Sequence, residues 1–270
     1  MPQDTNSDLA DRIGILTAII LLVYTMAHIV RSPELTLTIS LPGFYFSYPF
    51  SINTAISLMA AGLAATGMDW LIRLHPALGK KRTVEHWMLP TLTAFIISAP
   101  LSILPNGAIW WLSFAFGAIL LALVFWAEYT AVDPGAVNYA VARAGLTALS
   151  YVLFLILAAS MRFASLRLFL LLPTLFLAAG LISLRILHLD GTDRWDFPWA
   201  IGIGLVCAQI GAGLHYWALS PIQYALALTG PLYALTLLST SLAEGIPIRR
   251  ALTAPGIVMA VAWTTAAFIH

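Results

Sequence analysis

Charged residues are scarce in this sequence: they make up 9% of its 270 positions, whereas 60% of the residues are apolar. A soluble globular domain carries roughly 25% charged residues, so the composition excludes that class. The net charge of +1 gives no reason to expect nucleic acid as a partner. Because Cys207 is the only cysteine, an intramolecular disulfide and a cysteine metal cluster are both excluded.

Known catalytic and cofactor motifs are also missing. Both lysines, Lys80 and Lys81, lie outside the apolar runs, which excludes a Schiff base inside a membrane span. There is no GxSxG nucleophile elbow, no HExxH zinc pair and no P-loop. Haem held between spans needs two histidines at matching depth, and His28 with His215 is the one such pair. We therefore expect no cofactor and no metal, and we assign no catalytic residue.

Long apolar runs dominate what is present. A membrane-spanning helix needs about 20 mostly apolar residues, with charges gathered in the loops. This pattern predicts an all-α polytopic transmembrane bundle of about nine spans that forms one domain over 1–270. The predicted spans are 13–30, 51–72, 87–104, 108–128, 136–160, 167–188, 198–217, 221–242 and 251–269. For the third and fourth spans, where Pro90, Pro100 and Pro105 crowd the sequence, a broken or re-entrant segment is the alternative.

The basic residues predict the orientation of these spans. With the N-terminus in the cytoplasm, eight Lys and Arg residues fall on the inner side and three on the outer side, and positive charge favours the cytoplasm. The inner residues are Arg12, Arg73, Lys80, Lys81, Arg82, Arg194, Arg249 and Arg250, and the outer ones are Arg31, Arg162 and Arg167. We therefore expect a cytoplasmic N-terminus and an extracytoplasmic C-terminus.

One segment breaks the helical pattern. Residues 35–50 read LTLTISLPGFYFSYPF, with apolar and polar residues alternating around Pro42-Gly43. Alternation on both sides of a turn dipeptide predicts a short β-hairpin. We place it within 33–50, on the extracytoplasmic side between the first two spans. It would serve as an amphipathic flap at the membrane interface, or as a lid or docking edge for a partner strand.

Polar residues in two spans follow helical spacing. The eighth span has five of them at i, i+4, i+7, i+11 and i+15, which places them on one helix face. They are Thr229, Tyr233, Thr236, Thr240 and Glu244. Arg143, Thr147 and Ser150 form a second stripe in the fifth span. Facing one another, the stripes would form a polar seam open to the cytoplasm, with Arg143 paired to Glu244 or, as second choice, Glu128. Packing of Thr and Ser between helices is the alternative interpretation.

Ionisable residues near other span ends also need a reason, because charges in a membrane are costly. Asp69 and Arg73 form an i, i+4 pair at the inner end of the second span. We include Asp69 and Glu128 with the two stripes as candidate substrate-binding residues. Arg185 is interpreted as reaching water from its span end, and His86 as an ordinary exposed loop histidine.

Three functions fit these features. The first is a non-enzymatic protein, such as a transporter, that binds or moves a small polar or amphipathic molecule through the seam. The second is a membrane enzyme acting on a lipid, with acids, bases or ligands at the inner face. Those residues would be Asp69, Glu128, Arg143, Asp190, Asp193 and Glu244. The third is a structural subunit of a larger complex. Expected partners are membrane lipids, and either a second copy or another complex subunit.

Three stretches carry a resemblance. They are AGLAATGMDWLIRLHP at 61–76, AEYTAVDP at 127–134 and HYWALSPIQYALALTGPLYALT at 215–236. With the length and the layout of the spans, they resemble an uncharacterised family of bacterial polytopic integral membrane proteins, a domain of unknown function. The resemblance covers essentially the whole chain. It implies a protein of the bacterial cytoplasmic (inner) membrane, and it implies no named catalytic residue.

Overall fold

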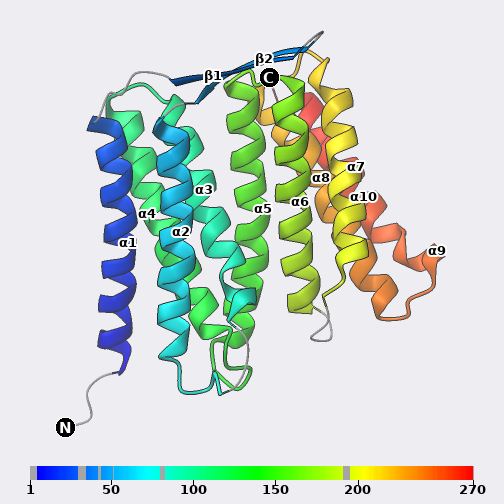
Figure 1. Cartoon of the computed structure of the whole chain (residues 1–270). Helices are drawn as coiled ribbons and strands as arrows, with labels where there is room; N and C mark the ends of the chain where they lie inside the picture. Colours follow the sequence, from blue (N-terminus) through cyan, green and yellow to red (C-terminus); the bar gives the residue numbers. More distant parts are fainter. Residues whose placement is uncertain are drawn as a thin grey trace. The chain divides into compact units, whose positions relative to one another are not determined.

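The computed structural model is almost entirely helical (Figure 1). It describes residues 5–29, 35–41, 44–50, 52–79, 83–190 and 195–269. Within those residues, nine helices are long and apolar enough to cross a membrane, so the predicted number of spans is confirmed. The chain forms two compact units, Met1–Asp133 and Pro134–His270, which are described one at a time. The single domain predicted from the composition stays a prediction.

The first unit contains four of the nine helices. Its elements are α1 (Thr5–Ile29), β1 (Leu35–Leu41), β2 (Phe44–Phe50), α2 (Ile52–Arg73), the 3-10 helix η1 (Val84–His86), α3 (Met88–Ile103) and α4 (Ala108–Thr130). Helix α3 accommodates Pro100 in its last turn and ends before Pro105. Gly107 then adopts a φ of 146°, a backbone conformation that glycine reaches without strain. The third and fourth spans are therefore two separate helices rather than a re-entrant segment.

Strands β1 and β2 pair in an antiparallel two-stranded sheet. The register runs from Leu35 opposite Phe50 to Leu41 opposite Phe44. β-Branched and aromatic residues, which favour extended backbone, fill much of both strands. The predicted turn, Pro42-Gly43, lies outside the described residues.

The helices of the first unit pack through small side chains and a few long-range hydrogen bonds. Helix α2 packs against α1 and α3, and α4 packs against the same two helices. Ala60 and Ala64 of α2 are fully buried, and such small residues let helix backbones approach closely. The Tyr24 hydroxyl of α1 donates to the carbonyl of Ala94 in α3. A membrane interior supplies no water to compete for the Tyr24 hydroxyl or the Ala94 carbonyl. This bond therefore fixes α1 against α3 in one register.

In the second unit, the described residues 134–190 and 195–269 contain six helices. They are α5 (Tyr139–Phe163), α6 (Leu168–Asp190), α7 (Phe197–His215), α8 (Pro221–Ala243), α9 (Ile248–Ala251) and α10 (Thr253–Phe268). The last two together make one span, Ile248–Phe268. Helix α8 begins at a capping box, in which the Ser220 hydroxyl accepts from the backbone N–H of Gln223 and the Gln223 side chain accepts in return.

Glycines let the second unit pack closely, with α6 against α7 and α8 against α10. A Cβ at Gly204 of α7 would lie 2.8 Å from the carbonyl oxygen of Phe176 in α6. A Cβ at Gly230 of α8 would lie 2.5 Å from the Cβ of Ala262 in α10. Neither position has room for a larger residue. Helix α5 packs against α8, as the polar stripes predicted.

Candidate functional site

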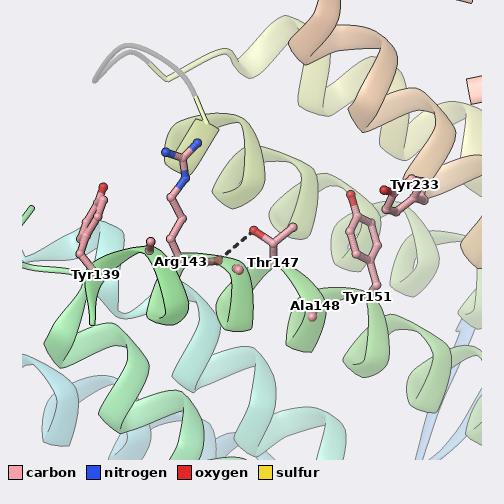
Figure 2. A pocket seen from close by; sticks show the side chains of 8 residues that line it. Tyr139, Arg143, Thr147, Ala148, Tyr151 and Tyr233 are labelled. Atoms are coloured by element: carbon pink, nitrogen blue, oxygen red, sulfur yellow. Dashed lines mark hydrogen bonds between the residues drawn. The ribbon is translucent and has the colours of Figure 1, made fainter. Parts of the chain in front are cut away.

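One hollow of the second unit is a groove along α5 (Figure 2). Tyr139, Arg143, Thr147 and Tyr151 follow one another at i+4 intervals and rise from the same side of the helix. A groove of about 540 Å³ runs beside this row, and Tyr233 of α8 closes its far end. It is lined by Tyr139, Ala140, Arg143, Ala144, Thr147, Ala148, Tyr151 and Tyr233. We call this hollow the α5–α8 groove.

A row of small side chains runs beside the row of long ones, which is what makes the groove hollow. Ala140, Ala144 and Ala148 follow one another at i+4 intervals, each one residue after a member of the long row, and side chains four residues apart share one helix face. The Thr147 hydroxyl donates to the carbonyl of Arg143, 3.1 Å away, within the same helix. Arg143 extends its guanidinium away from the α5 backbone. The groove therefore has a cationic group toward one end and an apolar floor.

The other end of the groove is aromatic and is fixed to α8. The Tyr151 hydroxyl lies 2.6 Å from the hydroxyl oxygen of Thr236. The rings of Tyr151 and Tyr233 lie 5.0 Å apart with an interplanar angle of 52°, a tilted arrangement that aromatic pairs favour. Thr236 is buried and also donates to carbonyls of its own helix. The tyrosine end of the groove is thus held rigidly.

The structure brings together only part of the predicted seam. Arg143, Thr147 and Tyr233 line the groove, and Thr236 supports it from behind. Ser150 is fully buried and donates to the carbonyl of Leu146 in its own helix.

The remaining members of the α8 stripe do not line the groove. Thr229 and Thr240 donate to carbonyls of their own helix, Ala225 and Leu237 respectively. Glu244 is the exposed C-cap of α8. The seam is therefore shorter than the stripes suggested, while an ion pair between Arg143 and a carboxylate of another span stays a prediction.

Two groove residues escaped the sequence analysis. Tyr139 and Tyr151 lie four residues before Arg143 and four residues after Thr147, so the same i+4 spacing could have found them. The predicted stripe includes Ser150 in their place. A tyrosine hydroxyl is a donor and acceptor as well.

In the first unit, Asp69 belongs to a separate cluster. Its carboxylate accepts from Arg73 Nε at 2.7 Å and from the Thr83 hydroxyl at 2.6 Å. The predicted i, i+4 pair is therefore present, and the hydrogen bond from Thr83 fastens the chain after α2 to the end of that helix. The guanidinium of Arg12 lies 5.7 Å from the ring of the neighbouring Trp70.

Glu128 is fully buried in α4, and His86 is its partner in the first unit. The distance from His86 Nδ1 to Glu128 Oε2 is 2.7 Å. The interpretation of His86 as an exposed loop histidine was wrong, because its side chain is only 7% exposed. Its neighbour Glu85 approaches the other ring nitrogen, Nε2, at 3.4 Å. No sequence pattern linked His86 with Glu128, since 42 residues separate them.

The interpretation of Arg185 as an arginine that reaches water was also wrong. Its side chain does not reach water from the end of α6 as a snorkelling arginine would, because only 2% of the residue is exposed. A buried guanidinium needs compensating acceptors, and Arg185 does have an interaction partner.

His75 follows α2, outside the predicted spans. Its Nδ1 accepts from the backbone N–H of Ala77 at 3.1 Å, and its ring packs 4.4 Å from that of Tyr129. Burial lowers the pKa of His75 below its usual value; the charge of His86 acts in the same direction and the Asp133 carboxylate opposes it. The neutral imidazole is therefore the form that the fold favours.

A second hollow of about 500 Å³ lies where α5 ends and α8 begins. Arg162 donates there to three backbone carbonyls of the α7–α8 connection: His215 at 3.0 Å, Trp217 at 2.7 Å and Leu219 at 3.3 Å. A cation at the end of α7 also complements the helix dipole. This arginine shapes the connection and leaves few donors for a ligand.

The acidic loop that the lipid-enzyme alternative used lies partly outside the described residues, since 191–194 are not among them. Asp196 is the exposed N-cap residue of α7. Within the part of the chain that the structure describes, no group of three or more His, Cys, Asp or Glu side chains is placed to hold a metal ion.

Comparison with curated proteins and with solved structures finds no match to this chain. One family model matches residues 32–269, and its description reads "protein of unknown function (DUF5656)". The match covers most of the chain, so the resemblance to an uncharacterised family is confirmed. The chain belongs to this family of proteins of unknown function, DUF5656.

Proposed function

We propose that this membrane protein binds an amphipathic molecule with an anionic headgroup in the α5–α8 groove. The observation that carries the proposal is the make-up of the groove: the guanidinium of Arg143 toward one end, a row of alanines along the floor, and two tyrosine rings at the other end. A phospholipid or fatty acid has a matching layout, an anionic group followed by an apolar chain.

The chemistry of Arg143 supports an anionic headgroup. A guanidinium has five N–H donors in a planar fork that matches carboxylate and phosphate oxygens. This number of donors allows one guanidinium to serve a partner within the protein and a ligand at the same time. Tyr139 and Thr147 flank Arg143 in the row and add hydroxyl groups that can bond a headgroup oxygen.

The floor and the aromatic end support an apolar chain. Ala144 and Ala148 offer a shallow apolar surface, and tyrosine rings present an apolar face beside a polar tip. Because Tyr151 is held by Thr236 and packs at a tilt against Tyr233, the surface is ordered before a ligand arrives. A preordered site loses less entropy on binding.

We further propose that the protein lies in the cytoplasmic (inner) membrane of a bacterium, with its N-terminus in the cytoplasm and its C-terminus outside. The excess of Lys and Arg on one set of loops supports this orientation. Arg143 stands near the start of α5, which this orientation places at the cytoplasmic side. The groove would then hold or move its ligand at the inner leaflet.

In the same orientation, the segment of β1 and β2 would lie on the extracytoplasmic side. The alternation of its aromatic residues supports a place at the membrane interface, where such rings gather. We propose that it is a flap on the outer surface, without a part in the groove.

The binding proposal can be tested with phosphatidylglycerol as the anionic probe and phosphatidylcholine as the zwitterionic one. Each lipid is added to the detergent-solubilised protein, and thermal unfolding is followed. We expect phosphatidylglycerol to raise the unfolding temperature more than phosphatidylcholine does. Arg143→Gln should reduce the affinity for phosphatidylglycerol by about tenfold or more, because a hydrogen bond to a charged group contributes about 1.5–3 kcal/mol.

Two control variants separate the groove from general attraction to anionic lipid. Arg249→Gln removes an exposed arginine of the same unit and should leave the stabilisation intact. Ala148→Trp fills the groove without altering its charge and should abolish the stabilisation, whereas Val141→Trp, on an exposed position outside the groove, should not. Equal stabilisation of wild type, Arg143→Gln and Ala148→Trp would refute the proposal and favour a structural role.

A further inference from the structure

The first unit buries a pair of titratable side chains that the α5–α8 groove does not use. Glu128, in the span formed by α4, is 0% exposed, and His86, on η1, is 7% exposed at its side chain. His86 Nδ1 and Glu128 Oε2 are 2.7 Å apart, a distance typical of a charge-assisted hydrogen bond. A carboxyl group buried this completely in a membrane helix calls for a functional explanation.

A third group connects the pair with solvent. Glu85 Oε1 lies 3.4 Å from His86 Nε2, and its side chain is 24% exposed. Side-chain exposure thus falls from 24% at Glu85 to 7% at His86 and 0% at Glu128. The imidazole stands between two carboxyl groups, with one ring nitrogen toward each. An imidazole in this position can accept a proton at one nitrogen and release another from the opposite nitrogen.

We infer that Glu85, His86 and Glu128 form a proton path that loads and unloads the buried carboxylate of Glu128. In the loading step, a neutral His86 carries its proton on Nδ1 and donates it in a hydrogen bond to the Glu128 carboxylate. A proton from the carboxylic acid of Glu85 forms a new N–H bond at Nε2, which gives an imidazolium and a Glu85 carboxylate. The Nδ1 proton then passes to Glu128 Oε2.

The step is balanced and reversible. Glu128 ends as a neutral carboxylic acid and His86 as a neutral imidazole protonated on Nε2, so one proton has moved from Glu85 to Glu128. Unloading runs the same transfers backwards and restores the proton on Nδ1. No oxidant, reductant or other reactant takes part. Glu85, whose side chain is partly exposed, exchanges its proton with water.

Further titratable side chains lie on the first-unit elements that surround the three residues. They include Arg12 of α1, Asp69 and Arg73 of α2, Tyr129 of α4, and the loop residues His75 and Asp133. Asp69 and Arg73 form a salt bridge at 2.7 Å and offset each other. Asp133 acts electrostatically on His75, which in turn acts on His86. Helix α3 contains no ionisable side chain.

Infrared difference spectroscopy on the full-length protein in lipid, with a jump in pH, tests the path directly. A protonated carboxyl group has a C=O stretching band that an ionised one lacks. We expect lowering the pH between about 9 and 4 to produce such a band. Glu128→Gln should abolish it, whereas Glu244→Gln, a matched change of an exposed glutamate, should not. Glu128→Gln preserves size and hydrogen bonding, and circular dichroism would verify that it folds.

The rate of proton uptake identifies the route. Glu85→Gln and His86→Gln should each leave the Glu128 band present at equilibrium but slow its appearance by at least tenfold. Two results would overturn the inference: a spectrum with no pH-dependent band assignable to Glu128, or uptake rates that Glu85→Gln and His86→Gln leave unchanged. Because the path lies in the first unit, either result is independent of lipid binding in the second.

Discussion

The hydroxyl groups of Tyr151 and Thr236 lie 2.6 Å apart and join α5 to α8 behind the tyrosine end of the groove. This single contact orients a ring that lines the groove and bonds a threonine that is almost completely buried. A hydrogen bond between two helices contributes more to stability where lipid, rather than water, surrounds the bundle. Measured contributions are about 1 kcal/mol.

Tyr151→Phe should therefore destabilise the second unit by about 1 kcal/mol. The loss is limited because Thr236 keeps its bonds to the carbonyls of Leu232 and Tyr233. Thermal unfolding in detergent would measure it. Tyr216→Phe, at an exposed tyrosine, should leave the unfolding temperature unchanged. If both variants behave alike, the Tyr151–Thr236 bond contributes nothing to stability.

Gly204→Ala should destabilise the protein by about 1–3 kcal/mol, since the added methyl group would press against a backbone carbonyl and force α6 and α7 apart. Gly202→Ala provides the matched control, because a Cβ at that position meets no atom within 4 Å. It should be neutral or slightly stabilising, since alanine favours a helix. Comparable losses in the two variants would show that α6 and α7 do not pack this closely.

The lowered pKa of His75 predicts that the stability of the folded protein depends on pH. Because burial lowers its pKa in the folded protein, the unfolded chain binds the proton more tightly. The stability from neutral His75 is fully present above the unfolded pKa of about 6.5 and is lost as the pH falls through that value toward the lower folded pKa. His75→Gln should lose less stability than wild type over this range, as measured by thermal unfolding. Identical pH profiles would contradict the assignment.

The proposed orientation predicts on which side of the membrane the C-terminus and the segment 76–84 lie. A reporter fused after His270 should be active outside the cytoplasm, and one inserted within 76–84 should be active inside it, because the basic run at 80–82 favours the cytoplasm. Alkaline phosphatase and green fluorescent protein provide complementary readouts. Activity of both fusions on the same side would overturn the proposed topology.

The number and position of the helices could be predicted because lipid leaves a spanning chain few choices. Backbone N–H and C=O groups must bond within the segment, so an apolar run of sufficient length becomes a helix. The proline-rich stretch between α3 and α4 was the doubtful part, and Pro105 and Gly107 there separate two helices. The pattern of apolar residues therefore predicts where the helices lie, but it does not predict which helices contact one another.

The candidate sites were harder to predict, because they depend on which helices meet and at what rotation. Spacing located the α5 row in part, but it could not show that Ser150 turns inward or that Glu244 stays exposed. The bond between His86 and Glu128 depends on η1 folding against α4, which no local pattern encodes. Arg185 looked able to reach water from its helix end, and its burial became visible only in three dimensions.

The most direct test of the central claim is a structure determined from crystals grown in a lipid mesophase doped with phosphatidylglycerol. The account predicts a headgroup bonded to the guanidinium of Arg143 and an acyl chain running over Ala144 and Ala148 toward Tyr151 and Tyr233. A groove filled by the protein's own side chains, or lipid density in it with no headgroup at Arg143, would contradict the account.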